Sequence, residues 1–245
     1  MYADTMTQHN PVDKNQLDLT AALRIIQNAG LADPLQSSDN PNAQIQSVIN
    51  SLCELSTHDG LTGLVNAIFF HAVLGREIDR SLRTGRTCGL MVIDIDHFKQ
   101  INDTYGHATG DKALQAVAEQ LRLSLRSMDT AARIGGEEFA VILPECAPDD
   151  AISAATRIHS GLNPLFIKTE QDGLRLTTSV GLVWTSPNTP VSSADLLSEA
   201  DQEMYRAKWS GRGRLCYRQP ELTMLSRQER SALMDLKLEE GANGH

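Results

Sequence analysis

Residues 130–143 read TAARIGGEEFAVIL, and the fold is decided here. Two short runs typical of strands, Thr130–Ile134 and Glu138–Leu143, lie on either side of the glycines Gly135 and Gly136. A glycine pair between such runs indicates a β-hairpin, because glycine adopts positive φ at low steric cost and leaves the backbone open to another molecule. The stretch therefore predicts two antiparallel strands whose turn carries two neighbouring carboxylates.

A second strand with acidic residues precedes the hairpin. Thr87–Ile95 is a compact apolar run that ends in carboxylates. Asp94 and Asp96 are separated by one residue, so an extended strand would point both side chains to one side. If this strand lies beside the hairpin, Asp94, Glu137 and Glu138 converge on one point.

Carboxylates that converge repel one another unless a divalent cation lies among them. Mg²⁺ accepts oxygen ligands and commonly completes its shell with the phosphates of a substrate. The pattern of acids and glycines therefore predicts metal-assisted phosphoryl or nucleotidyl transfer. A solvated acidic turn is the alternative that these residues alone leave open.

Helical and strand patterns alternate through residues 58–218. Apolar spacing of three and four residues predicts helices at Asn66–Leu82, Gly110–Arg126, Pro148–Leu162 and Ser193–Lys208, and alternation predicts a strand at Leu174–Val183. Strands that alternate with helices and include a hairpin are typical of a sheet flanked by helices. We expect an α+β domain over residues 58–218.

Residues 1–57 precede this domain as a helical extension, and residues 219–245 follow it as a tail with a charged helix at Pro220–Glu240. Helical spacing occurs at Leu17–Ile26 and again over residues 43–57. The second of these helices carries an apolar stripe formed by Ile45, Val48, Ile49, Leu52 and Leu55. Such a stripe must pack on another surface, which is either its own domain or the same helix of a second copy in a dimer stalk.

The composition narrows the classes of partner. The chain has 245 residues, with 22 Lys and Arg against 31 Asp and Glu, for a formal net charge of −9. An acidic body repels phosphate, which argues against a nucleic-acid-coating role. No run approaches the roughly 20 apolar residues of a membrane span, and residues 1–10 lack the pattern of a secretory signal. The four cysteines, Cys53, Cys88, Cys146 and Cys216, lack metal-site spacing. We therefore expect a cytoplasmic protein.

The motifs resemble a known family. Gly135–Phe139 matches the GG(D/E)EF signature of the GGDEF domain, the diguanylate cyclases. Residues 59–66 (DGLTGLVN), 94–111 (DIDHFKQINDTYGHATGD), 178–181 (TSVG) and 200–212 (ADQEMYRAKWSGR) match it in order and spacing. The resemblance implies a mixed, antiparallel-containing sheet wrapped by helices, similar to the palm of nucleotide polymerases and adenylate cyclases.

The resemblance also implies a reaction. The family joins two GTP molecules into cyclic di-GMP and releases two pyrophosphates, with Mg²⁺ or, as a substitute, Mn²⁺. By position, Asp94, Glu137, Glu138 and the Ile95 carbonyl would hold the metal, and the three acids would be catalytic. Glu137 or a metal-bound group would help to deprotonate the attacking ribose 3′-hydroxyl. Because each site holds one GTP, two domains must face each other, so a homodimer is implied.

Substrate contacts follow from the same positions. Asn102 and Asp111 would read guanine, because a carboxylate accepts from the N1–H and N2–H₂ edge that adenine lacks. The triphosphate would be bound by Lys99, Lys208, Arg212 and the amides of the Asp96–Phe98 turn, with Phe98 contributing its backbone. Asp111 would also favour the N-terminus of its predicted helix, where it falls in the first turn.

A product site is implied upstream of the hairpin. Arg126-Ser127-Met128-Asp129 matches the family's RxxD site for inhibitory cyclic di-GMP, and Arg157 would add a contact from the next helix. Arginine offers a planar fork to a phosphate or a guanine edge, and aspartate accepts from guanine.

Several matched positions have structural explanations. We interpret His107 as a structural hydrogen-bonding residue and Thr62 and Asn66 as helix caps. Ala67 stands where the family usually has arginine.

Two other functions compete with that of an active diguanylate cyclase. A non-catalytic receptor would bind cyclic di-GMP at Arg126, Asp129 and Arg157, but degenerate family members usually lose glycines or acids that this sequence keeps. A cyclase that uses ATP conflicts with Asp111, which repels the acceptor N1 of adenine.

Overall fold

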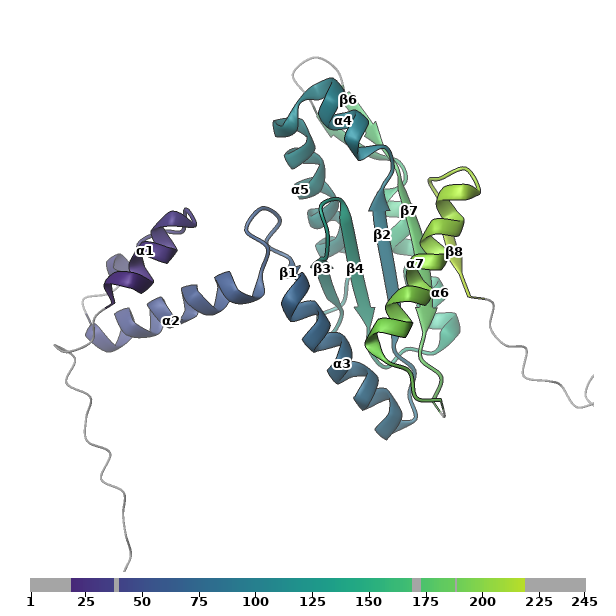
Figure 1. Ribbon diagram of the computed structural model, residues 1–245, viewed down its shortest axis with the longest axis horizontal. Helices are drawn as coiled ribbons and strands as arrows, with labels where there is room; N and C mark the ends of the chain where they lie inside the picture. The colour runs from purple at the N-terminus through teal and green to yellow at the C-terminus, as the bar shows by residue number, and fades with distance from the viewer. Residues whose placement is uncertain (1–18, 38–39, 169–172, 188, 219–245) are drawn as a thin grey trace, which may run out of the picture.

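The computed structural model of the protein describes residues 19–37, 40–168, 173–187 and 189–218. The predicted helix at Pro220–Glu240 lies outside the described residues, as does the start of the first predicted helix. The described part is α+β, as predicted: a mixed six-stranded sheet with helices on both faces (Figure 1).

The sheet has the strand order β1-β3-β4-β2-β7-β8. The strands are β1 (Val65–Asn66), β2 (Gly89–Ile95), β3 (Thr130–Arg133), β4 (Glu138–Leu143), β7 (Thr178–Trp184) and β8 (Leu215–Tyr217). β2 is central, antiparallel to both β4 and β7, while β1 and β8 pair in parallel at the two edges. All seven residues of β2 are buried, which explains its nearly continuous apolar sequence.

Side chains of β2 alternate between two cores. Met91 and Ile93 pack with α5 (His107–Ser124) and α6 (Pro148–Leu162) on one face. Leu90 and Val92 pack with α3 (Ala67–Thr84) and α7 (Ser193–Trp209) on the other. Each face therefore has its own helix pair, and the carboxyl end of β2 emerges between them (Figure 1).

Local signals explain where the helices begin. Asn66 caps α3, because its side chain accepts from the Phe69 amide at 3.0 Å. Pro148 opens α6 within its first turn, followed by Asp149 and Asp150. Ser192 caps α7 by accepting from the Asp195 amide at 3.1 Å.

The structure corrects several predicted elements. A separate helix, α4 (Phe98–Tyr105), precedes α5, which starts at His107 rather than Gly110. Gly106, at φ 81°, separates the two helices. The predicted strand Leu174–Val183 is two strands, β6 (Gly173–Leu176) and β7, interrupted at Thr177. β6 pairs with β5 (Leu165–Lys168), a hairpin that the sequence analysis missed.

The described part of the N-terminal extension, residues 19–37 and 40–57, is mainly helical, as predicted. It comprises α1 (Thr20–Asn28), the 3₁₀ turn η2 (Pro34–Ser37) and α2 (Pro41–Thr57). Figure 1 shows α1 and α2 beyond the β1 edge of the sheet. Val48 of the α2 stripe is 1% exposed, whereas Ile49 is 47% exposed. The contacts of α2 are mainly with η2 and α1, so the six-stranded sheet leaves most of the stripe uncovered.

None of the helices in the described ranges combines the length and the apolar character needed to cross a membrane.

Candidate active site

The hairpin at residues 130–143 forms as predicted, with Arg133 paired to Phe139. One of the two expected reasons for its glycines is wrong, because neither Gly135 nor Gly136 has a positive φ. A Cβ at Gly135 would collide with the Glu138 side chain, while one at Gly136 would meet open space. Gly135 therefore leaves room for the Glu138 carboxylate, and Gly136 leaves the backbone of the turn uncovered by a side chain.

The end of β2 places three acids together. In the antiparallel register of β2 and β4, Asp94 lies directly opposite Glu138. Asp94 is 4% exposed, and Glu137 and Glu138 are half-buried. Nζ of Lys208, from the last turn of α7, lies 2.8 Å from Asp94 Oδ2. Lys208 thus neutralises the most buried of these acids.

Burial and neighbouring charges raise the pKa of two of these acids, Asp94 and Glu137. Burial raises the pKa of Asp94, and Glu138 and Asp96 add to the rise while Lys208 opposes it. Burial also raises the pKa of Glu137, with Asp94 and Glu138 contributing and Lys208 again opposing. The site therefore concentrates negative charge that one lysine only partly offsets.

This donor set fits a hard divalent cation. Carboxylate oxygens from two adjacent strands, together with a backbone carbonyl at Ile95, are the ligands that Mg²⁺ prefers. Within the described residues, no three His, Cys, Asp or Glu side chains are already arranged around a common metal position. The Asp94 carboxylate is paired with the Lys208 ammonium, which supplies one positive charge. A bound metal would supply further positive charge at the same acids.

Asp96 lies just beyond the end of β2, so the expectation that an extended strand points it to the same side as Asp94 does not apply. Its carboxylate accepts hydrogen bonds from the Thr177 and Ser179 hydroxyls and from the Gly213 amide. Its role is therefore different from that of Asp94.

The proposed triphosphate contacts lie around the turn after β2. The Phe98 side chain is buried, and its backbone begins α4, where amides lack helical partners. His97 precedes it at φ 58°, a left-handed conformation that turns the chain. Lys99 is exposed beside this turn, and Arg212 is exposed on the loop after α7.

The proposed guanine contacts sit where α4 meets α5. A Cβ at Gly110 would collide with Oδ1 of Asn102, so the glycine makes space for this amide beside α5. Asp111 follows directly and is exposed. It lies in the second turn of α5, not the first as predicted, because the helix begins at His107.

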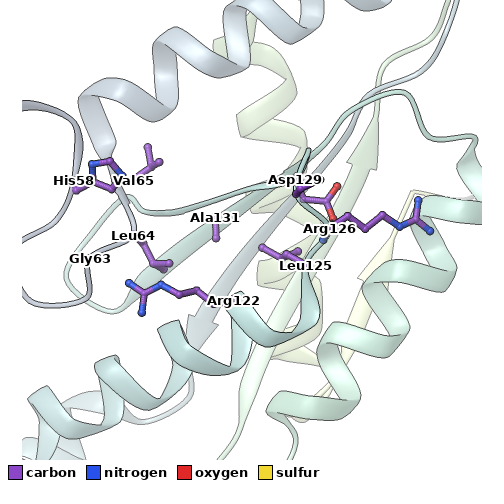
Figure 2. A pocket seen from close by; sticks show the side chains of 10 residues that line it. His58, Gly63, Leu64, Val65, Arg122, Leu125, Arg126, Asp129 and Ala131 are labelled. Carbon is purple, nitrogen blue, oxygen red and sulfur yellow. The ribbon is translucent and has the colours of Figure 1, made fainter. Parts of the chain in front are cut away.

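The three residues of the proposed product site gather at the end of α5. Asp129 Oδ2 accepts from the Arg126 amide at 2.9 Å, which closes the turn. Arg157, on α6, donates to the Ser124 carbonyl just before that turn. A pocket of about 320 Å³ borders this corner, lined by His58, Gly63, Leu64, Val65, Arg122, Leu125, Arg126, Ser127, Asp129 and Ala131 (Figure 2). The Arg126 side chain extends away from the residues of the 58–65 segment (Figure 2).

Comparison with known families agrees with this geometry. The family described as diguanylate cyclase, GGDEF domain, matches residues 56–214. The chain belongs to this GGDEF family. It is 42% identical over 163 residues to the probable diguanylate cyclase DgcC of Escherichia coli K12, covering 65% of this chain and 43% of DgcC. It is 36% identical over 191 residues to the response regulator PleD of Caulobacter vibrioides, covering 74% and 42%.

The chain thus spans less than half the length of these relatives. Among solved structures, it resembles the coiled coil and GGDEF domain of DgcB from Caulobacter crescentus in complex with c-di-GMP. The TM-score is 0.66 at 30% identity, covering 71% of this chain and 92% of that one. SiaD of Pseudomonas aeruginosa, solved with its activator SiaC, gives a TM-score of 0.65 at 31% identity, covering 81% and 74%.

The GGDEF domain contains a connection that the sequence analysis missed. Nη1 of Arg133 lies 3.3 Å from Asp59, and its Nη2 donates to the Gly136 carbonyl at 2.7 Å. Burial would raise the pKa of Asp59, but hydrogen bonds from Thr62 and the charge of Arg133 lower it. Thr62 donates to the Asp59 carboxylate in the 59–64 turn and therefore is not a helix cap, whereas Asn66 is one. The pairing of residues 74 positions apart carries no local sequence signal.

Proposed function

We propose that this GGDEF domain condenses two GTP molecules into cyclic di-GMP with release of two pyrophosphates. The observation that carries the proposal is the register of β2 and β4, which sets Asp94 opposite Glu138 beside Lys208. Three acids at the ends of adjacent strands suit a reaction that handles polyphosphate. GTP is a cytoplasmic nucleotide, so the proposal places the domain in the cytoplasm.

The acids would hold Mg²⁺ through Asp94, Glu137, Glu138 and the Ile95 carbonyl. When bound, the metal would neutralise charge at the α-phosphate and lower the pKa of the ribose 3′-hydroxyl. Glu137 or a metal-bound group would accept the proton of that hydroxyl. The 3′-oxygen then bonds to the α-phosphorus as the bond to the pyrophosphate oxygen breaks.

The remaining residues would bind and orient the nucleotide. Lys99, Lys208 and Arg212 would neutralise the triphosphate together with the backbone amides at Phe98. Asn102 and Asp111 would select guanine at the junction of α4 and α5. Without substrate, Lys208 lies within hydrogen-bonding distance of the Asp94 carboxylate. When the nucleotide binds, Lys208 would give up part of this contact and bind a phosphate oxygen.

Two domains must act together, because each site holds one GTP and the product joins two. We propose a homodimer as the active form, with product inhibition at Arg126, Asp129 and Arg157. A receptor that only binds cyclic di-GMP is the second candidate, favoured by the pocket beside Arg126 and Asp129.

The test is incubation of the purified protein with GTP and Mg²⁺, followed by mass spectrometry. We expect cyclic di-GMP from the wild type, and its loss with EDTA or in Glu138→Gln, which keeps the size of the side chain. Binding of cyclic di-GMP without any consumption of GTP would establish the receptor instead.

A further inference from the structure

Asp96 is a buried acid to which the proposed reaction gives no role. Its side chain is 4% exposed, yet no basic side chain pairs with it among the described residues. Oδ2 accepts from Thr177 Oγ1 at 2.8 Å and from the Gly213 amide at 2.9 Å, and Oδ1 accepts from Ser179 Oγ at 2.7 Å. The carboxylate is thus satisfied by neutral donors, as a buried charge requires.

These donors come from three separate parts of the chain. Asp96 follows β2, Thr177 lies just before β7 and Ser179 within it, and Gly213 lies in the loop between α7 and β8. The Asp96 amide also donates to the Thr177 carbonyl at 2.9 Å. Asp96 therefore connects the α7–β8 loop to the sheet by hydrogen bonds, at the start of the turn formed by residues 96–98.

The fastened loop has an unusual backbone. Arg212 has φ 60° and Gly213 has φ 57°, so two consecutive residues are left-handed. Such a conformation is costly for arginine and persists only where surrounding contacts hold it. The Arg212 amide donates to the Ala207 carbonyl at 3.1 Å, which fixes the loop to α7, and the Gly213 amide fixes it to Asp96.

We propose that Asp96 is a positioning residue that holds the α7–β8 loop so that Arg212 faces the triphosphate bound at the 96–98 turn. This inference rests on the proposed function. Lys208 is placed by the helix itself, whereas Arg212 lies beyond the helix end and depends on the loop. Asp96 acts on the substrate only through Arg212, while Asp94, two residues earlier, faces the acids and Lys208.

Substitutions separate the geometry of Asp96 from its charge. Asp96→Asn keeps an oxygen for Thr177 and Gly213 and directs its amide nitrogen to Ser179, whose hydroxyl can accept. Asp96→Ala leaves all three donors without an acceptor. Thr177→Val is the matched control, because it removes one donor to the same oxygen and leaves the bond to Gly213.

The measurements are calorimetric binding of the α,β-methylene analogue of GTP with Mg²⁺, and steady-state turnover of GTP. For Asp96→Ala we expect Kd and KM to rise about tenfold, the loss of one charged phosphate contact, with kcat changed by less than about threefold. Asp96→Asn and Thr177→Val should stay within about threefold of the wild-type Kd.

A double-mutant cycle with Arg212→Ala decides the mechanism. If Asp96 acts through Arg212, Asp96→Ala causes no further loss of analogue binding in the Arg212→Ala background. Additive losses, or equal falls of kcat in Asp96→Ala and Asp96→Asn at unchanged KM, would overturn the inference. Thermal unfolding checks that each variant folds; if Asp96→Ala does not, Asp96→Glu, which displaces the carboxylate by one methylene, replaces it with the same expectation.

The outcomes also separate this inference from the proposed function. If the wild type binds the analogue but does not consume GTP, the proposed reaction is contradicted. The double-mutant cycle of Asp96 and Arg212 can then still be measured by analogue binding. A wild type that does not bind the analogue contradicts both.

Discussion

At the scale of single residues, Gly181 shows how closely α7 approaches the sheet. A Cβ at this position would collide with the Ala200 carbonyl oxygen and the Met204 amide nitrogen, both backbone atoms that cannot move independently. This close approach is what allows Lys208, one turn beyond Met204, to reach Asp94.

We therefore predict that Gly181→Ala destabilises the protein by about 3 kcal/mol, the upper range for overpacking a core. Urea unfolding followed by circular dichroism measures this loss. Gly60→Ala is the matched control, because a Cβ there meets no atom within 4 Å and its φ is not positive. Equal stability of the two variants would refute the close approach.

The cysteines differ in their surroundings. Cys88 is 1% exposed, and burial raises the pKa of its thiol to about 12, with the charge of Glu77 adding to the rise. Because the thiolate is the reactive form, Cys88 should be inert at neutral pH. We predict that iodoacetamide at pH 8 modifies the exposed Cys53 and spares Cys88, read by peptide mass spectrometry. Labelling of Cys88 at the same rate as Cys53 in folded protein would contradict this.

His159 carries a pH dependence. Burial lowers its pKa from 6.5, against the opposing effects of the Gly213 backbone and Asp96, and its Nε2 has no partner within the described ranges. The unfolded chain then binds a proton that the folded chain resists, so stability is lost as pH falls below 6.5.

We predict that His159→Gln weakens this loss. The measurement is the melting temperature of both proteins between pH 7.5 and 5.5. The difference between variant and wild type isolates His159 from Asp94 and Glu137, whose raised pKa values act in the opposite direction. Parallel curves for the two proteins would show that His159 does not titrate differently on unfolding.

At the scale of elements, segments marked by a clear start or turn signal were predictable, and segments without one were not. The predicted helix Pro148–Leu162 has the observed bounds, because proline and two acids mark its start and apolar spacing continues to its end. α4 was missed because it is only eight residues long and joins α5 at Gly106. The break at Thr177 was missed because apolar alternation continues across it.

The site was predictable to a similar degree. Asp94 can meet Glu138 only if their strands are neighbours, and periodicity does not give the strand order. In the structure β2 and β4 are neighbours, with Asp94 opposite Glu138. The pairing of Asp96 with Thr177, Ser179 and Gly213 was not predictable from alternation, because the chain has left the strand at Asp96. The roles of all these residues remain predictions.

The turn between α5 and β3 carries a prediction about regulation. Asp129 closes this turn through the Arg126 backbone amide, a bond that does not involve the Arg126 side chain. Arg126→Ala should therefore abolish inhibition by added cyclic di-GMP and leave initial turnover within about twofold of the wild type. Turnover assays over a series of product concentrations measure this, and undiminished inhibition of the variant would contradict it.

At the scale of the whole molecule, the α2 stripe is only partly covered. Ile49 is exposed on a helix that lies beyond the edge of the sheet (Figure 1), which favours contact with a second copy. Deletion of residues 1–50 should lower specific activity most at dilute protein, because fewer domains then pair.

Ile49→Asp should act in the same direction, whereas Gln46→Glu, on the exposed polar side of α2, should not. Specific activity measured across a series of protein concentrations provides the test. If the specific activity of the deletion variant depends on protein concentration as that of the wild type does, α2 does not contribute to dimerisation.

The most direct test of the central claim is the stoichiometry of the reaction. Purified protein is incubated with GTP and Mg²⁺, and both products are quantified by mass spectrometry and a pyrophosphate assay. We predict that two pyrophosphates form for each cyclic di-GMP and that the Asp94→Asn variant does not turn over GTP. GTP that stays intact, or a linear dinucleotide that is never closed, would contradict it.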